Sequence, residues 1–119
     1  MKCITDRENI VIAYLHNMMI IDLMQKKVIG LVIGNCVFGK GKDPIGKILN
    51  NTFLHFSGEK LALLKEETHT PDSIKLQEKD FIIEAWIILK NVQNHTCIWI
   101  EEKNNWHEND LLCLLQQEK

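Results

Sequence analysis

The side chains best suited to chemistry lie near the C-terminal end of the chain. His95 and Cys97 are two residues apart, and His107 follows further along. A histidine beside a cysteine can generate a nucleophilic thiolate, and the same residue types bind zinc. Residues two apart share a face of any strand, however, so this spacing is not specific. A zinc site also needs a third and a fourth ligand, which the sequence does not supply at a recognisable spacing. We therefore expect no catalytic, metal-binding or cofactor-binding residues.

The cysteines predict neither a metal site nor a disulfide framework. They are Cys3, Cys36, Cys97 and Cys113, with no C-x-x-C pair among them. Charged residues continue up to Glu8 where a signal peptide would be apolar, and no apolar run is long enough to span a membrane. We expect a cytoplasmic protein with reduced thiols and no membrane contact.

The net charge of −2 conceals an asymmetry between two parts of the chain. Residues 1–66 carry 9 Lys/Arg and 6 Asp/Glu, whereas residues 67–119 carry 5 and 10. Neither part has the dense basic face of a nucleic-acid binder, so no nucleic-acid partner is expected. Segments of opposite charge attract each other, either within one chain or across a dimer.

A repeat extends over the first part of the chain. A branched aliphatic residue precedes a small residue four times, at intervals of 17, 16 and 16 positions, and the small residues are Ala13, Gly30, Gly46 and Ala62. Each unit begins with a polar turn, which leads into a short apolar strand that carries the small residue. In the first three units a second turn and a second strand follow, and these turns are His16-Asn17, Gly34-Asn35 and Asn50-Asn51. Asn and Gly tolerate the positive φ of tight hairpin turns.

The repeat predicts the fold class. We expect a mainly β protein with a helical C-terminal appendage, in which four short β-hairpin repeats occupy residues 1–66 in a pseudo-four-fold arrangement. A glycine inside a strand lowers stability unless another backbone approaches closely there. The four small residues therefore predict four strands that converge where a larger side chain would clash.

The repeat also resembles a known family. The matching runs are Ile12-Ala13-Tyr14-Leu15, Ile29-Gly30, Ile45-Gly46-Lys47 and Phe56-Ser57-Gly58-Glu59-Lys60-Leu61-Ala62. Over residues 4–66 they resemble the bacterial four-fold beta-flower family, which implies a fold but no activity, cofactor or site residues. Only Gly58 keeps the turn glycine of that family; Asn9 and either Lys26 or Lys27 stand in the first two units. Asp43-Pro44-Ile45-Gly46-Lys47-Ile48 is similar to PRC-barrel domains, a weaker alternative.

Residues 67–119 break the repeat and predict an α/β tail that packs on the β domain. Apolar residues at helical spacing favour a helix at about 78–92, although a strand competes there. A strand is expected at about 96–101 and a leucine-rich helix at about 108–117, with Asn109 or Asp110 near its start.

All three tryptophans lie in this tail, at Trp86, Trp99 and Trp106. Tryptophan fills cores, but it is also enriched at interfaces and in pockets. We therefore expect a non-enzymatic interaction or scaffold protein that acts through the tail, by self-association as a homodimer or by binding another protein. One alternative is a small-ligand module with an aromatic pocket between the β domain and the tail. The other is a thiol-dependent enzyme.

Overall fold

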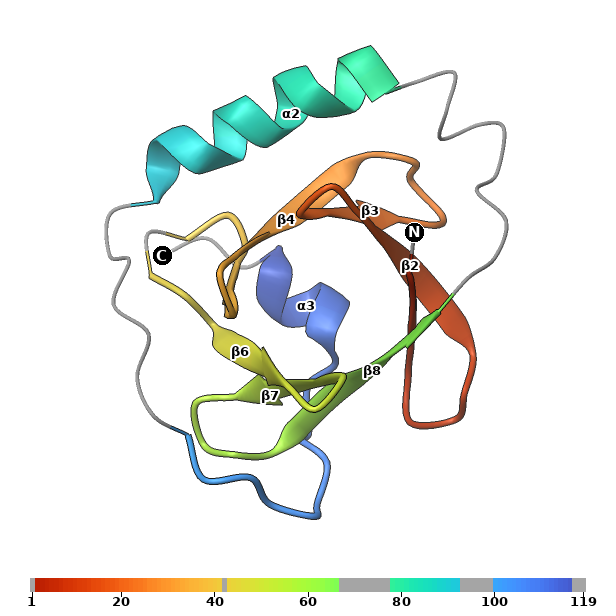
Figure 1. Cartoon of the computed structure of the whole chain (residues 1–119), viewed down its shortest axis with the longest axis vertical. Helices are drawn as coiled ribbons and strands as arrows, with labels where there is room; N and C mark the ends of the chain where they lie inside the picture. Colours follow the sequence, from red (N-terminus) through yellow and green to blue (C-terminus); the bar gives the residue numbers. More distant parts are fainter. Residues whose placement is uncertain (1, 42, 67–77, 93–99, 117–119) are drawn as a thin grey trace.

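The computed structural model describes residues 2–41, 43–66, 78–92 and 100–116. Within them, consecutive strands pair antiparallel and form one closed barrel (Figure 1). The strands are β1 (Lys2–Thr5), β2 (Val11–His16), β3 (Met19–Asp22), β4 (Val28–Ile33), β5 (Cys36–Phe38), β6 (Gly46–Leu49), β7 (Thr52–His55) and β8 (Lys60–Glu66). The predicted fold class, mainly β with hairpin pairs followed by C-terminal helices, is confirmed.

The barrel closes because the N-terminal strand completes the fourth unit. β2–β3, β4–β5 and β6–β7 are hairpins, and β8 pairs antiparallel with β1 from the other end of the sequence. An exposed ion pair between Lys2 and Glu66, at 3.5 Å, lies at the end of this pairing. The hairpin pattern of the sequence did not predict this closure, since no local signal links β1 to a strand about sixty residues away.

The three hairpin turns have the backbone conformation expected from their residue types. Asn17 and Met18 have φ of 48° and 68°, and Asn50 and Asn51 have 51° and 58°. Two consecutive positive φ values match the twist of the flanking strands in a two-residue hairpin. In the remaining hairpin turn, between β4 and β5, Gly34 has a φ of 62°. The prediction that Asn and Gly supply positive φ is confirmed at Asn17, Gly34, Asn50 and Asn51, but the first turn is Asn17-Met18 instead of His16-Asn17, and a methionine supplies its second positive φ.

The turns before β2, β4 and β8 share a second local feature. Asp6 and Asp22 each accept a backbone N–H through Oδ1, and His55 accepts one through Nδ1, at 2.9, 3.1 and 3.1 Å. The residues with positive φ in these turns are Asn9 (67°), Lys26 (51°) and Gly58 (93°). The turn at Asp6–Asn9 closes over three residues as the one at His55–Gly58 does, although Asn9 replaces the glycine of the beta-flower pattern, whereas the turn at Asp22–Lys26 is one residue longer.

In three of the four units the small residue adjoins a β-bulge. The register shifts by one residue in three of the pairings, and the extra residues are Ile12, Ile29 and Leu61, which precede Ala13, Gly30 and Ala62. In the third unit the N–H of Ile45 donates to the carbonyl oxygen of Val37 at 2.8 Å, and Val37 is also the partner of Gly46. A bulge bends its strand and increases the local twist. The repeated bulge thus supplies the curvature that closes the barrel.

Two of the small residues lie where other groups approach closely. A Cβ added to Gly30 would lie 2.7 Å from the carbonyl oxygen of Phe38 and 2.8 Å from Cδ2 of Leu115. A Cβ added to Gly46 would meet the carbonyl oxygen of Leu54 and lie 2.9 Å from its carbonyl carbon. Because the obstacle at Gly46 is backbone of the neighbouring strand, it cannot move aside as a flexible side chain can.

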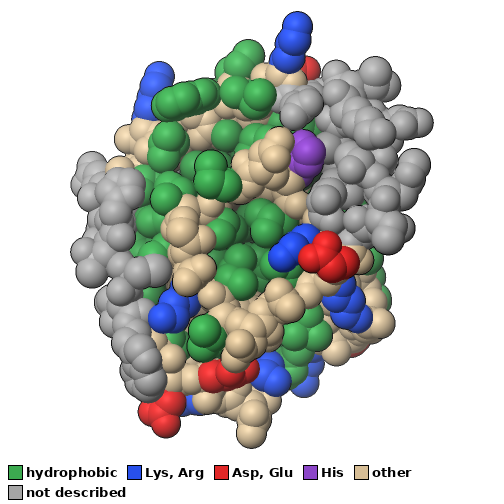
Figure 2. Space-filling model, viewed as in Figure 1, with side chains coloured by type: hydrophobic (Ala, Val, Ile, Leu, Met, Phe, Trp, Pro, Cys, Tyr) green, Lys and Arg blue, Asp and Glu red, His purple; other side chains and the backbone are tan. Residues whose placement is uncertain are grey.

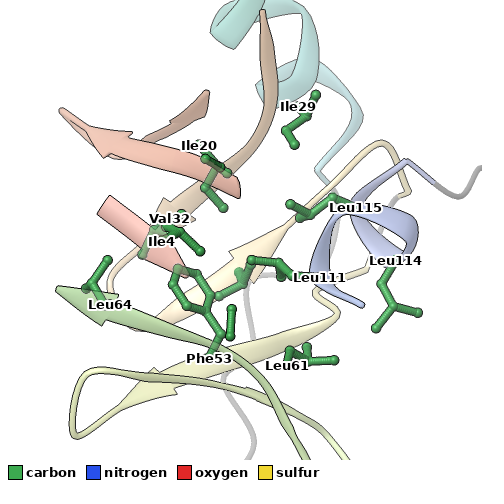
Figure 3. Packing of buried hydrophobic residues seen from close by; sticks show 13 residues of the cluster. Ile4, Ile20, Ile29, Val32, Phe53, Leu61, Leu64, Leu111, Leu114 and Leu115 are labelled. Atoms are coloured by element: carbon green, nitrogen blue, oxygen red, sulfur yellow. The ribbon is translucent and has the colours of Figure 1, made fainter. Parts of the chain in front are cut away.

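The helix α3 (Leu111–Leu115) lies inside the ring of strands in Figure 1. Leu111 and Leu115 are fully buried, whereas Cys113 is exposed, so one side of the helix faces the barrel interior. Figure 3 shows both leucines among strand side chains of one cluster, which include Ile4, Ile20, Ile29, Val32, Phe53, Leu61 and Leu64. Asp110 caps the helix by accepting from the N–H of Cys113 at 2.7 Å. The helix therefore starts later than the expected range 108–117.

The helix α2 (Glu78–Asn91) lies outside the ring, alongside β4 (Figure 1). It corresponds to the helix expected at about 78–92, so the competing strand interpretation is wrong. The strand expected at 96–101 falls mostly outside the described residues. Neither described helix is both long and apolar enough to cross a membrane.

We predict that Gly46→Val strongly destabilises the fold, because its Cβ would overlap the backbone of Leu54. The expected loss is about 2–3 kcal/mol, or roughly 10 °C in melting temperature by circular dichroism. Gly34→Asn is the control, because Gly34 has open space around it and asparagine tolerates its positive φ. An unchanged melting temperature for Gly46→Val would contradict the close approach.

Candidate functional site

An apolar groove lies between α2 on one side and strands β3 and β4 with the β2–β3 turn on the other. Its volume is about 360 Å³, and its lining residues are Asn17, Met18, Met19, Leu31, Ile33, Ile82, Ala85, Trp86 and Leu89. Asn17 is the one residue with a polar side chain in this set. The groove therefore offers an apolar surface with little capacity to orient a polar ligand.

The apolar sequence of β4 explains why a helix packs on the outside of the barrel. Ile29 and Val32 belong to the interior cluster, whereas Val28 and Leu31 belong to a second cluster on the outer side. A strand covered on both faces has a continuous apolar sequence instead of an alternating one. Phe81 and Ile88 of α2 complete the second cluster, and both are buried.

A charged hydrogen bond also fixes α2 to the barrel. Oε2 of Glu84 accepts from the backbone N–H of Val28 at 2.7 Å. Val28 is the first residue of β4, so this bond joins the middle of the helix to the start of the strand on which it packs. The bond sets the position of α2 and hence the width of the groove.

The outward side of α2 exposes large apolar side chains to solvent. Ile82, Ile83, Trp86 and Ile87 are 45, 62, 60 and 59% exposed. Met18, on the β2–β3 turn at the edge of the groove, is 62% exposed. Figure 2 shows hydrophobic side chains gathered on the upper part of this face, where α2 lies. Monomeric proteins rarely expose large contiguous apolar patches, so such a patch indicates an interaction site.

The structure places the predicted tryptophans apart. Trp86 lines the groove, whereas Trp106 is half-buried and forms an isolated bridge with Lys60 of β8. In Figure 1, α2 and the segment before α3 lie on opposite sides of the barrel. Trp99 lies outside the described residues. The described tryptophans therefore do not form one aromatic site.

The sequence did not single out a polar cluster at the β7–β8 turn. The rings of His55 and His107 are 4.4 Å apart between centroids. The hydroxyl of Ser57 donates to Oε1 of Glu59 at 3.0 Å, and the side-chain amide of Asn105 donates to Oε2 at 2.7 Å. Asn105 and His107 lie about fifty residues along the chain from His55, Ser57 and Glu59, so no local sequence pattern indicates the cluster.

The hydrogen bonds of this cluster close a turn, although they include one contact that a serine nucleophile would also make. A serine–histidine–acid site needs the hydroxyl to donate to the histidine, and the carboxylate to hold the other ring nitrogen. Oγ of Ser57 does lie 3.1 Å from Nδ1 of His55. However, the hydroxyl donates to Oε1 of Glu59, and the same Nδ1 accepts the backbone N–H of Ser57. Nδ1 of His107 likewise accepts the N–H of Asn109 at 3.0 Å. The contacts hold the segment before α3 against the turn.

The state of the cysteines differs in part from the sequence expectation. Cys36 is disulfide-bonded, so the expectation of four reduced thiols is wrong for this residue. Cys3 is a buried free thiol and Cys113 an exposed one. Disulfides persist in oxidising compartments, so this bond does not favour the cytoplasmic expectation. The candidate pair of His95 and Cys97 falls outside the described residues.

Among the residues that the structure describes, no group of three or more His, Cys, Asp or Glu side chains is placed to hold a metal ion. Comparison of the chain with protein-family models, with curated proteins and with solved structures gives no match. The resemblance to the beta-flower and PRC-barrel families is therefore supported at the level of a closed antiparallel barrel of eight strands, and not at the level of a family.

We predict that Glu84→Ala loosens α2 from the barrel, because it leaves the N–H of Val28 without its charged acceptor. Such a bond contributes about 1.5–3 kcal/mol. Hydrogen exchange at Val28 and in α2 should therefore become roughly tenfold to a hundredfold faster. Glu8→Ala, at an exposed glutamate of the β1–β2 turn, should leave these rates unchanged. Equal exchange in Glu84→Ala and the wild type would contradict a positioning role for Glu84.

Proposed function

We propose that the protein is a non-enzymatic interaction module that binds an apolar protein surface through the outward face of α2. The observation that carries this proposal is the run of exposed apolar residues on one helix, Ile82, Ile83, Trp86 and Ile87. Exposing these side chains to water is unfavourable, and a partner that covers them recovers the free energy of apolar burial.

The chemistry of the described residues favours binding over catalysis. The polar cluster around Ser57 is bonded as a turn, and the groove beside α2 is lined almost wholly by apolar side chains. Aromatic and apolar anchors such as Trp86 are typical of the centre of a protein interface. These features support a contact surface as the functional part of the molecule.

The proposal predicts that capture of a partner depends on this face. Immobilised wild-type protein should enrich specific proteins from an extract of its native cells, measured by quantitative mass spectrometry. Ile87→Lys should reduce that enrichment at least about tenfold, because it buries a charge without a partner in the interface. Met24→Lys is the control, because Met24 is also exposed but lies in the β3–β4 turn. Equal capture by wild type and Ile87→Lys would refute the proposal.

A second candidate function is the binding of a small apolar ligand in the groove. Its volume of about 360 Å³ lies within the usual range of ligand pockets, and Trp86 forms part of its wall. The near absence of polar lining residues would suit an aliphatic chain better than a polar metabolite. This candidate matches the expected aromatic pocket between the β domain and the tail.

Titration with decanoate, followed by calorimetry, tests this candidate. Binding should weaken at least about tenfold in Ala85→Phe, because the larger ring fills the groove, and in Trp86→Ala, because part of its wall is lost. Ile10→Ala is the control, because Ile10 is exposed but does not line the groove. Absence of binding at about 1 mM decanoate, or equal binding by all variants, would exclude the candidate.

Kinship with the four-fold beta-flower family is also a proposal. It is supported by the side-chain acceptors that recur in the turns at Asp6, Asp22 and His55, and by the bulges beside Ala13, Gly30 and Ala62. A PRC-barrel-like assignment rests on the third unit alone.

A further inference from the structure

The outermost residues of α2 form a stripe with opposite charges at its ends. Asp80, Ile83, Ile87 and Lys90 are spaced by three, four and three residues. On a helix this spacing places the four side chains in one row, as in the seam of a coiled coil. Asp80 lies near the N-terminal end of the row and Lys90 near its C-terminal end, with the two isoleucines between them.

This stripe points away from the barrel. Phe81 and Ile88, which pack on β3 and β4, lie on the opposite side of the helix, and both are buried. Ile83 and Ile87 are 62 and 59% exposed, and Asp80 and Lys90 are exposed. The stripe is also distinct from the row that lines the groove, to which Ile82 and Leu89 belong. It is therefore a second surface on the same helix, accessible to a partner without opening the groove.

We propose that this stripe binds the same stripe of a second copy of the chain, with the two α2 helices antiparallel. In that arrangement Ile83 of each copy faces Ile87 of the other, and Asp80 of each copy faces Lys90 of the other. Two apolar pairs at the centre are thus flanked by two ion pairs at the ends. In this register Lys79 faces the uncharged side chain of Asn91.

The charges of the stripe select both the partner and the direction. A parallel pair would place Asp80 against Asp80 and Lys90 against Lys90, and like charges that face each other are unfavourable. The antiparallel pair has two-fold symmetry and closes on itself, as most homodimer interfaces do. An unrelated helix bound antiparallel would need the same spacing and the same order of charges along its own chain. A second copy meets both requirements by symmetry.

The size of the surface sets the expected affinity. The inference rests on the proposed function, because it names the partner of the exposed face of α2. A helix of 14 residues is about 20 Å long, so the contact belongs to the small class of interfaces. We expect a reversible dimer with a Kd on the order of 10–100 μM, which concentration would control.

Sedimentation of the full chain at low salt, from about 5 to 500 μM, tests the inference. The wild type should shift from monomer to dimer over this range, and Ile87→Lys should remain monomeric. Asp80→Lys and Lys90→Asp should each raise the Kd about tenfold, since each change places like charges together at both ends of the symmetric pair. The double variant Asp80→Lys with Lys90→Asp restores opposite charges and should return the Kd to near the wild-type value.

The double variant separates pairing from an effect on the helix itself. An acidic residue near the N-terminus and a basic residue near the C-terminus both favour helix formation, so each single change weakens α2 slightly. These losses add in the double variant, whereas the pairing between copies is restored. Recovery of the dimer therefore supports the antiparallel contact, and further weakening would overturn it. Glu8→Lys, which changes net charge as Asp80→Lys does, should leave the Kd unchanged.

Two further outcomes would overturn the inference. One is a wild type that remains monomeric at the highest concentration, and the other is a dimer that Ile87→Lys does not affect. If the wild type is monomeric while capture from cell extract still depends on Ile87, the second copy is not the partner and the proposed function stands. If capture is also independent of Ile87, both proposals fail.

Discussion

The close approach of neighbouring strands beside a small residue is the constraint on which the rest of the structure depends. The N–H of Ile45 bonds to Val37, which also pairs with Gly46, and Gly46 leaves no room for a Cβ against the backbone of Leu54. Related bulges occur beside Ala13, Gly30 and Ala62. Each one bends a strand, and together they turn the meander far enough for β8 to pair with β1.

Closure determines what the remaining apolar residues must cover. The interior is filled in part by Leu111 and Leu115 from α3, and Gly30 and Gly39 leave space for this helix. The outer face of β4 stays apolar, and α2 covers it with Phe81 and Ile88. One helix therefore completes the inside of the barrel while the other completes the outside.

The exposed apolar face of α2 follows from the way in which α3 packs inside the barrel and α2 packs outside it. α3 packs its leucines against the interior cluster, and Leu112 is the partly buried one. α2 is apolar around more of its circumference than the barrel can cover, so Ile83 and Ile87 remain exposed. His55, Ser57 and His107 are chemically more reactive groups, but they hold the β7–β8 turn and the segment beside it. The exposed apolar face of α2 thus supports a binding role, whereas the polar groups around Ser57 stabilise a turn.

The sequence by itself determined the hairpins, because positive φ at Asn17, Gly34 and Asn50 is a local property of the residue type. It also favoured α2 over a competing strand and a helix start near Asn109 or Asp110, because periodicity and capping are local, and the structure then singled out Asp110 as the cap. Tertiary structure alone decided the pairing of β1 with β8, the placement of α3 inside the ring and the contact of His55 with His107. These join residues far apart in sequence, so no short pattern encodes them. The exposure of Trp86 belongs with them, since its spacing suits a core equally well.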